Sequence, residues 1–145
     1  MIATVPSATL LGVRGRAVSV EVHVANGMPG FTIVGLPDAS CREARDRVRA
    51  ALVSSGVAWP QRRITVNLAP SGLRKSGSQL DLAIAVALIM CCEVVEPAQV
   101  EGMAFLGELG LDGTIRPVVG TVPLVDAVSS STVVVPSASV AEAEL

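Results

Sequence analysis

Two stretches of this sequence carry the residue types that could do chemistry: a glycine-containing basic loop at residues 72–79, and an arginine-rich segment upstream of it. The loop reads GLRKSGSQ and has the glycine spacing of a phosphate-binding P-loop. A P-loop places a lysine and then Ser or Thr directly after its second glycine, to reach the phosphates and Mg²⁺. Here Ser78 and Gln79 take those positions and Lys75 lies inside the loop, so the spacing argues against an ATP site. Two alternatives stay open: an anion site at the N-terminus of the following helix, or a basic surface loop without a ligand.

The arginines form a second candidate site, because clustered guanidinium groups can neutralise phosphates without reading base sequence. Arg42, Arg45 and Arg49 are spaced by three and four residues and therefore share one face of a helix. The candidate residues for nucleic-acid or phosphate contact are Arg42, Arg45, Arg49, Arg62, Arg63, Arg74 and Lys75. The alternatives are a salt-bridged face between subunits and an ordinary solvated helix, on which Glu43 and Asp46 pair with neighbouring arginines.

Charge is distributed unevenly along the chain. The net charge is −2, but residues 1–75 hold ten of the eleven basic residues and four acids, which gives +6. Residues 76–145 hold Arg116 and nine acids, which gives −8. We therefore expect one basic and one acidic region on the surface. That pattern suits an anionic partner on one face, and it suits head-to-tail contact between copies equally well.

Hydrophobic periodicity predicts the elements that must position these residues. Residues 17–24 alternate strictly, with four valines on one side and His23 on the other, as in a half-buried strand. We expect residues 31–36 to pair with that strand in a hairpin, because turn-forming residues 26–30 separate the two. The remaining predicted elements are a helix at 38–55, a strand at 63–68, a central buried helix at 79–92, a hairpin of 104–109 with 114–118, a helix at 122–128, a strand at 132–135 and a helix from 137.

Composition excludes several classes of function. The 145 residues suit one domain, and only Phe31, Phe105 and Trp59 are aromatic, so stacking platforms for single-stranded bases are few. Cys41, Cys91 and Cys92 lack metal spacing, and we expect no metal site. The longest apolar run, 82–92, is shorter than the roughly 18–20 residues that span a bilayer. With no signal peptide visible, we expect a cytoplasmic protein with no membrane partner.

Several motifs in fixed order resemble those of a known family. FTIVGLPDASCREARDRVRAAL, then RRITVNLAPSGLRKSGSQLDLAIAVAL, then FLGELGLDGTIRPV are similar to the signature of ComM/YifB proteins, the magnesium chelatase-like AAA+ family. The resemblance covers about residues 1–130. It implies that residues 1–145 form one N-terminal domain with an α+β fold, a two-layer sheet-and-helix domain of the ribosomal protein S5 domain 2 type, like the proteolytic domain of Lon.

The likeness to Lon raises a peptidase hypothesis, which the matched positions argue against. Lon-type peptidases use a serine nucleophile and a lysine base, and a serine hydroxyl needs such a base to attack. Matching the K-x-G steps onto Lys75 and Gly77 puts Gln79 in the nucleophile's place. Matching the later glycine hairpin puts Val122 in the base's place. Neither side chain can do that chemistry, so we predict no catalytic residue in this chain, with Ser78 one position away from the motif.

The resemblance also implies a setting for this domain. An AAA+ module with Walker motifs is expected downstream, with ATP and Mg²⁺ as its cofactors and a hexameric ring as its assembly. Members such as ComM act as DNA branch-migration helicases in transformation. We therefore expect this chain to assist DNA processing without catalysing a reaction, by contacting DNA or by helping the ring assemble. A pure oligomerisation domain is the alternative, and a residual Ser peptidase is the third.

Overall fold

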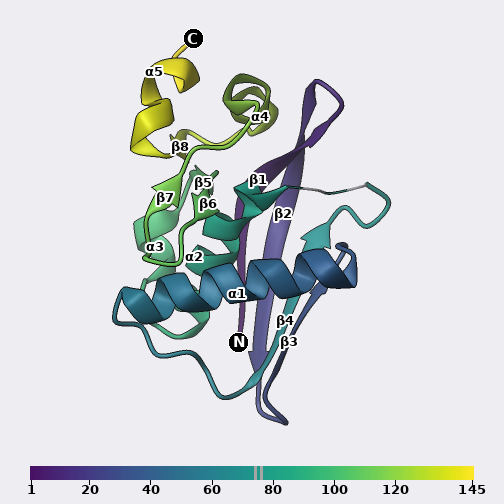
Figure 1. The fold of residues 1–145 in the computed structure, drawn as a ribbon, viewed down its shortest axis with the longest axis vertical. Helices are drawn as coiled ribbons and strands as arrows, with labels where there is room; N and C mark the ends of the chain where they lie inside the picture. The colour runs from purple at the N-terminus through teal and green to yellow at the C-terminus, as the bar shows by residue number, and fades with distance from the viewer. Residues whose placement is uncertain (74, 76) are drawn as a thin grey trace.

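The computed structural model describes residues 1–73, 75 and 77–145, and its centre is a four-stranded sheet. The strands lie in the order β1-β2-β4-β3 (Figure 1). Strand β2 is antiparallel to both of its neighbours, β1 and β4, while β3 is parallel to β4. Their bounds are Ile2–Leu11 for β1, Arg14–Ala25 for β2, Gly30–Val34 for β3 and Arg63–Ala69 for β4.

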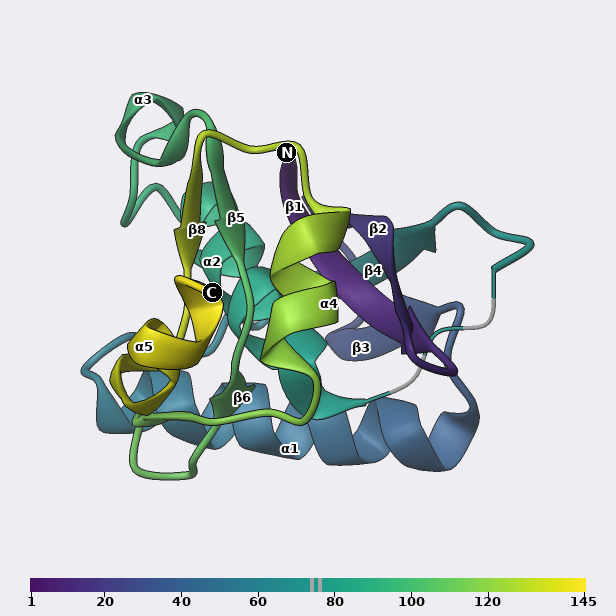
Figure 2. The ribbon, with the colours of Figure 1, turned by 90° about the horizontal axis from the view of Figure 1, so that it is seen from above.

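Two helices cover one face of this sheet. Seen from above, α1 (Asp38–Ser54) runs across the molecule beside α2 (Asp81–Cys91) (Figure 2). All of α2 except Ile89 is buried, as predicted for a central helix. The inward side chains of β2 and β4 pack beneath the helices, also as predicted: Val18, Val20, Val22, Val24, Ile64, Val66 and Leu68. The α+β class is confirmed. Within the described residues, no helix combines the length and apolar character that crossing a bilayer requires.

The predicted hairpin of residues 17–24 with 31–36 is wrong. Strand β2 pairs with β1 on one side and β4 on the other, and β3 lies at the far edge beyond β4. The turn at residues 26–30 therefore carries the chain past a position that β4 fills later. Helix α1 supplies the crossover that a parallel pair such as β3 and β4 requires.

Periodicity does not predict β1, which forms an edge of the sheet. Its inward positions include Ser7 and Thr9, both fully buried, and small polar residues there hide the alternation. Burial is tolerated because the hydroxyl of Ser7 donates to the carbonyl of Phe105 at 2.7 Å. Pro6, within the strand, is accepted because an edge strand has one side without ladder hydrogen bonds.

Residues 97–145 pack against the ends of the sheet and α2. Strand β5 (Met103–Phe105) pairs in parallel with β8 (Thr132–Val134), and β6 (Glu108–Leu109) pairs antiparallel with β7 (Ile115–Arg116). The predicted second hairpin is confirmed only at its tip, because residues 103–105 leave it for β8. The helices of this part are α3 (Pro97–Val100), α4 (Thr121–Ala127) and α5 (Val140–Ala143). Helix α4 packs against the β1–β2 hairpin.

Candidate nucleic-acid interface

The outer face of α1 carries the three arginines that helical spacing predicts together. Arg42 and Arg49 are exposed, and Arg45 is half-buried. Arg45 and Arg49 border a hollow of about 230 Å³ between α1 and the segment leading into β4. Its other walls include Phe31, Asp46, Trp59 and Gln61. The fold thus brings two guanidinium groups to the rim of one polar hollow.

Different contacts hold these two arginines in place. The Arg49 guanidinium lies 5.8 Å from the centre of the Trp59 ring, a cation–π contact that orients it. Trp59 is itself held against Phe31, with 5.7 Å between the ring centres. Arg45 pairs with the neighbouring Asp46 at 3.0 Å, an exposed ion pair of little energetic worth. A phosphate would find Arg49 already oriented and would compete with Asp46 for Arg45.

Of the other predicted arginines, the two that the structure describes, Arg62 and Arg63, do not join this face. Arg63 lies on β4 at a position that faces away from the helices, where its Nη2 donates to Thr32 Oγ1 at 3.4 Å. Arg62 is exposed and lies near Cys92. Burial raises the pKa of the Cys92 thiol, and the positive charge of Arg62 offsets part of that rise. Arg74 lies outside the residues that the structure describes.

Lys75 corrects the prediction of a basic surface loop. Its side chain is buried, with 3% exposed, and its ammonium group donates to the carbonyl oxygen of Pro70. The carbon stem passes close to Gly35 at the end of β3. The long apolar stem of a lysine can fill such a space while a carbonyl satisfies the charge. Lys75 therefore holds its own loop closed and is not available to an external phosphate.

Sequence reasoning missed a partly buried ion pair, which joins α1 to α2. Arg47 donates to Asp81 through Nε at 2.6 Å and Nη2 at 3.1 Å, and the amide of Leu109 donates to the same carboxylate at 3.2 Å. Asp81 is 1% exposed. Burial raises the pKa of Asp81 despite the opposing effect of Arg47, and the hydrogen bond to Asp81 raises the pKa of Arg47. The sequence did hold a signal for this ion pair. Arg47 lies on a different side of α1 from the other arginines, and Asp81 begins a helix that is otherwise apolar.

The loop that resembles the peptidase motif borders two joined hollows. One, of about 260 Å³, reaches toward α1, and the other, of about 270 Å³, reaches toward residues 117–119. They share Gly77, Ser78 and Glu108. Besides the paired Arg47 and Asp81, the hollow on the α1 side is lined by Glu43 and Glu108. The negative charge of these two glutamates disfavours an anion at this helix N-terminus.

The two positions matched to a peptidase dyad hold other chemistry. Gln79 is buried, and its amide lies directly over Gly77, where an added Cβ would overlap it. Its Nε2 donates to the hydroxyl of Thr9 at 3.3 Å, so the amide ties the loop to β1. Val122 lies half-buried in the first turn of α4. Ser78 lines both hollows. The ammonium group of Lys75 donates to the carbonyl oxygen of Pro70.

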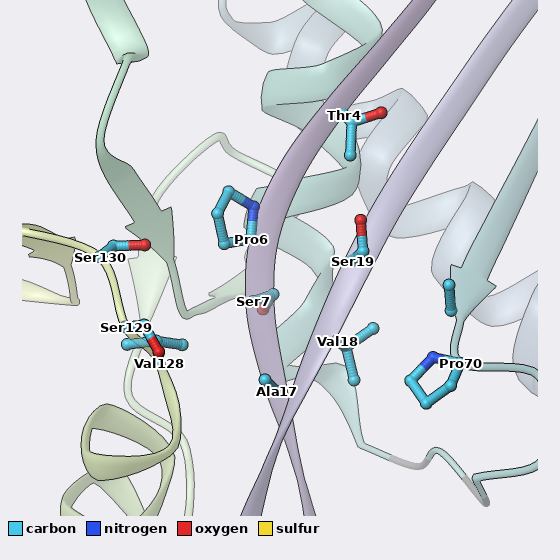
Figure 3. A pocket seen from close by; sticks show the side chains of 11 residues that line it. Thr4, Pro6, Ser7, Ala17, Val18, Ser19, Pro70, Val128, Ser129 and Ser130 are labelled. Carbon is cyan, nitrogen blue, oxygen red and sulfur yellow. The ribbon is translucent and has the colours of Figure 1, made fainter.

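A larger hollow than these lies elsewhere, on the outer side of the sheet. It has a volume of about 610 Å³ and lies between strands β1, β2 and β4 and residues 128–130 (Figure 3). Its walls are apolar groups and hydroxyls, among them Pro6, Ser19, Pro70 and Val128, and none of its lining residues carries a charge. Among the described residues, no group of three or more His, Cys, Asp or Glu side chains could hold a metal ion.

Comparison with known proteins places the chain. The family model described as subunit ChlI of Mg-chelatase matches residues 20–139. The chain belongs to this ChlI family. Among relatives, the ChlI-family chain is 45% identical over 121 residues to YifB of Salmonella typhimurium, covering 83% of this chain and 24% of that protein. It is 42% identical over 130 residues to competence protein ComM of Haemophilus influenzae. That match covers 90% of this chain and 26% of ComM. The chain therefore spans about a quarter of the length of these relatives.

The geometry shows what two of the motifs that carry the family resemblance do in this chain. The helix motif EARDRVRAAL contributes Arg47, and the motif K-x-G-x-x-x-D-L contributes Lys75, Gly77 and Asp81. The ion pair of Arg47 with Asp81 joins the two helices, while Lys75 closes the loop between β4 and α2. These motif residues therefore support the fold, and the predicted arginines of α1 lie on the opposite face of that helix.

Proposed function

We propose that this domain is a non-catalytic part of a larger DNA-processing protein and that it contacts DNA through Arg42, Arg45 and Arg49 on α1. The observation that carries the proposal is the exposed row of guanidinium groups, with Arg49 oriented by Trp59 at the rim of a polar hollow. Arginine forks match phosphate oxygens. Phosphate contacts position a protein on DNA without reading sequence, so we expect binding that depends on salt and not on base order.

The family supplies the setting of this proposal. One relative is named competence protein ComM, which supports a role in competence, and within that role we propose DNA recombination and branch migration. For the whole protein we propose an AAA+ ATPase that uses ATP and Mg²⁺ and assembles as a cytoplasmic hexamer. In that ring the domain would guide DNA or hold neighbouring subunits.

The test is a titration with labelled duplex DNA at two salt concentrations. Trp59 is the only tryptophan and tyrosine is absent, so its intrinsic fluorescence reports events at Arg49 directly. Three phosphate contacts from α1 should contribute about −3 to the slope of log K against log salt. Absence of binding at low salt, or binding that does not change with salt, would contradict the proposal.

A matched pair of variants locates the contact. Arg42→Gln, Arg45→Gln and Arg49→Gln combined should weaken binding and flatten the salt slope. Arg63→Gln is the control, because Arg63 is equally exposed but lies on the other side of the sheet. If Arg63→Gln weakens binding and the triple variant does not, DNA binds on the Arg63 side of the sheet and the proposal for α1 is wrong.

Assembly is the second candidate function, because the +6 and −8 regions of the chain could meet between copies. Sedimentation of the chain with and without Arg42→Glu and Arg45→Glu would separate it from DNA binding. A chain that stays monomeric at high concentration would count against an oligomerisation role.

Peptidase activity is the third candidate, and we propose that the chain has none. Gln79 and Val122 occupy the matched dyad positions, and the amide of Gln79 is engaged with Thr9. Hydrolysis of an unfolded protein that disappears in Ser78→Ala would overturn this proposal. Hydrolysis that survives Ser78→Ala would point to a contaminating enzyme.

A further inference from the structure

The end of the β1–β2 hairpin presents an exposed, basic and partly apolar tip. The two strands pair as far as Leu11 opposite Arg14, and Gly12 and Val13 form the turn. Val13 is 89% exposed and Leu11 is 45% exposed. Arg14 and Arg16 are exposed as well, and no acidic residue occurs in residues 1–20. In Figure 1 this tip stands beside α4, well separated from α1.

Helix α4 braces one face of this hairpin. An added Cβ at Gly15 would overlap the carbonyl oxygen of Pro123 and lie 2.9 Å from the Cβ of Ala127, so the helix rests directly on the hairpin backbone. Leu10, opposite Gly15 in the ladder, packs against Gly120 at the start of the helix. The hairpin is therefore packed against α4 near Gly15, while Val13 at its tip is exposed.

The open face of the hairpin is the face that carries the charge. Residues directly opposite each other in an antiparallel pair share a face. Leu11 pairs with Arg14, and Thr9 pairs with Arg16, so these side chains lie on the face that α4 does not cover. Because the Thr9 hydroxyl accepts a hydrogen bond from Gln79, this face continues toward the 77–79 loop.

We propose that this tip is a second nucleic-acid contact, in which Arg14 and Arg16 hold phosphates and Val13 packs against an unpaired base. The proposal rests on the proposed DNA-binding function but uses a different element. A valine side chain cannot form the hydrogen bonds that read base edges in an intact groove. Apolar side chains gain contact where base faces are open, and proteins use them as wedges at unstacked steps. The preferred ligand is therefore DNA with a junction between duplex and single strand.

The experiment compares binding to a forked DNA and to a blunt duplex with equal phosphate count. Fluorescence anisotropy is measured for the wild-type chain, for Val13→Asn and for Arg14→Gln combined with Arg16→Gln. Asparagine is well tolerated in turns, so Val13→Asn should fold normally. The matched controls are Val94→Asn, at a valine 55% exposed beyond α2, and Arg116→Gln in β7. Circular dichroism confirms the fold of each variant.

We expect the wild type to bind the fork about fivefold more tightly than the duplex, which is the order of affinity that partial burial of one valine side chain gives. Val13→Asn should bind both DNAs equally. The double arginine variant should make the slope of log K against log salt less steep by about 2, one for each lost phosphate contact. Both controls should behave as the wild type. Equal wild-type affinity for the two DNAs, or a fork preference that survives Val13→Asn, would overturn the proposal.

The same data separate this proposal from the one for α1. If the α1 triple variant loses affinity while the hairpin variants bind as the wild type does, the tip proposal fails and the α1 proposal stands. If the hairpin variants lose affinity while the α1 variant does not, the reverse holds. A wild type that binds no DNA at low salt overturns both, and binding to phosphatidylglycerol vesicles without binding to DNA would assign the tip to membranes instead.

Discussion

Arg47 and Arg49 lie two residues apart on α1, yet the fold uses them in opposite ways. Arg47 forms a bidentate ion pair with Asp81, which is 1% exposed, and so joins α1 to α2. Arg49 is exposed over the ring of Trp59 at the rim of an open hollow. Removing a partner from a buried pair leaves an uncompensated charge, whereas removing an exposed arginine leaves only water in its place.

The same contrast separates Lys75 from Arg45. Lys75 is buried and bonded to Pro70, while Arg45 makes only an exposed pair with Asp46. Four residues that would count equally in a net-charge argument thus fall into two groups: cations bonded to distant parts of the chain, which stabilise the fold, and cations at the surface, which a ligand can reach. Variants of the first group should change stability, and variants of the second should change affinity.

The largest effect is expected for Arg47→Ala. Asp81 would keep the bond from Leu109 but lose its cationic partner, which costs about 3–5 kcal/mol of unfolding free energy. Denaturant unfolding measures the loss. Replacing both residues, Arg47→Leu with Asp81→Leu, should recover most of it, because the charge and its partner are removed together. A loss below about 1 kcal/mol for Arg47→Ala would mean that the pair is not buried as described.

The Arg47→Ala penalty should also depend on pH. Burial already raises the pKa of Asp81, and loss of Arg47 would raise it further. A carboxyl whose folded pKa lies above its unfolded pKa stabilises the fold at low pH and loses that contribution as pH rises through the folded value. The difference between wild type and Arg47→Ala should therefore be large at pH 7 and should shrink on acidification. Unfolding curves over a pH series would show this, and a difference that grows toward acid would contradict the assignment.

Lys75→Met should lower the unfolding free energy by about 1–3 kcal/mol, because the charged hydrogen bond to Pro70 is lost while much of the stem packing is kept. DNA affinity should stay at the wild-type level, because the ammonium group does not face solvent. Thermal melting and the DNA titration together test both statements. A weaker DNA affinity with unchanged stability would show that Lys75 contributes to DNA binding and not to the fold.

Much of the fold follows from the sequence, since the valines of β2, the alternation of β4 and the apolar run of α2 are strong periodic signals. The partner of β3 does not follow, because strand pairing depends on β4, which comes after a whole helix. Strand β1 escapes prediction because Ser7 and Thr9 face inward. Local patterns cannot show which hydroxyls a fold will satisfy.

The candidate site divides in the same way. Helical spacing correctly predicts that Arg42, Arg45 and Arg49 share a face. It cannot tell that Arg63 points to the other side of the sheet or that Lys75 turns inward, because both outcomes depend on contacts between distant segments. The pairing of Arg47 with Asp81 spans 34 positions and is likewise a property of the packed helices.

The smallest effect on stability, and the clearest effect on binding, is expected for Arg49→Gln. An exposed arginine that contacts one ring should contribute no more than about 0.5–1 kcal/mol to unfolding. DNA affinity should fall uniformly across sequences and the salt slope should decrease by about 1, as for loss of one phosphate contact. Trp59 fluorescence should change in the free variant, because the cation over its ring is gone. Arg63→Gln serves as the exposed control. The contrast between the two sides of α1 would fail if Arg49→Gln destabilised the fold as much as Arg47→Ala.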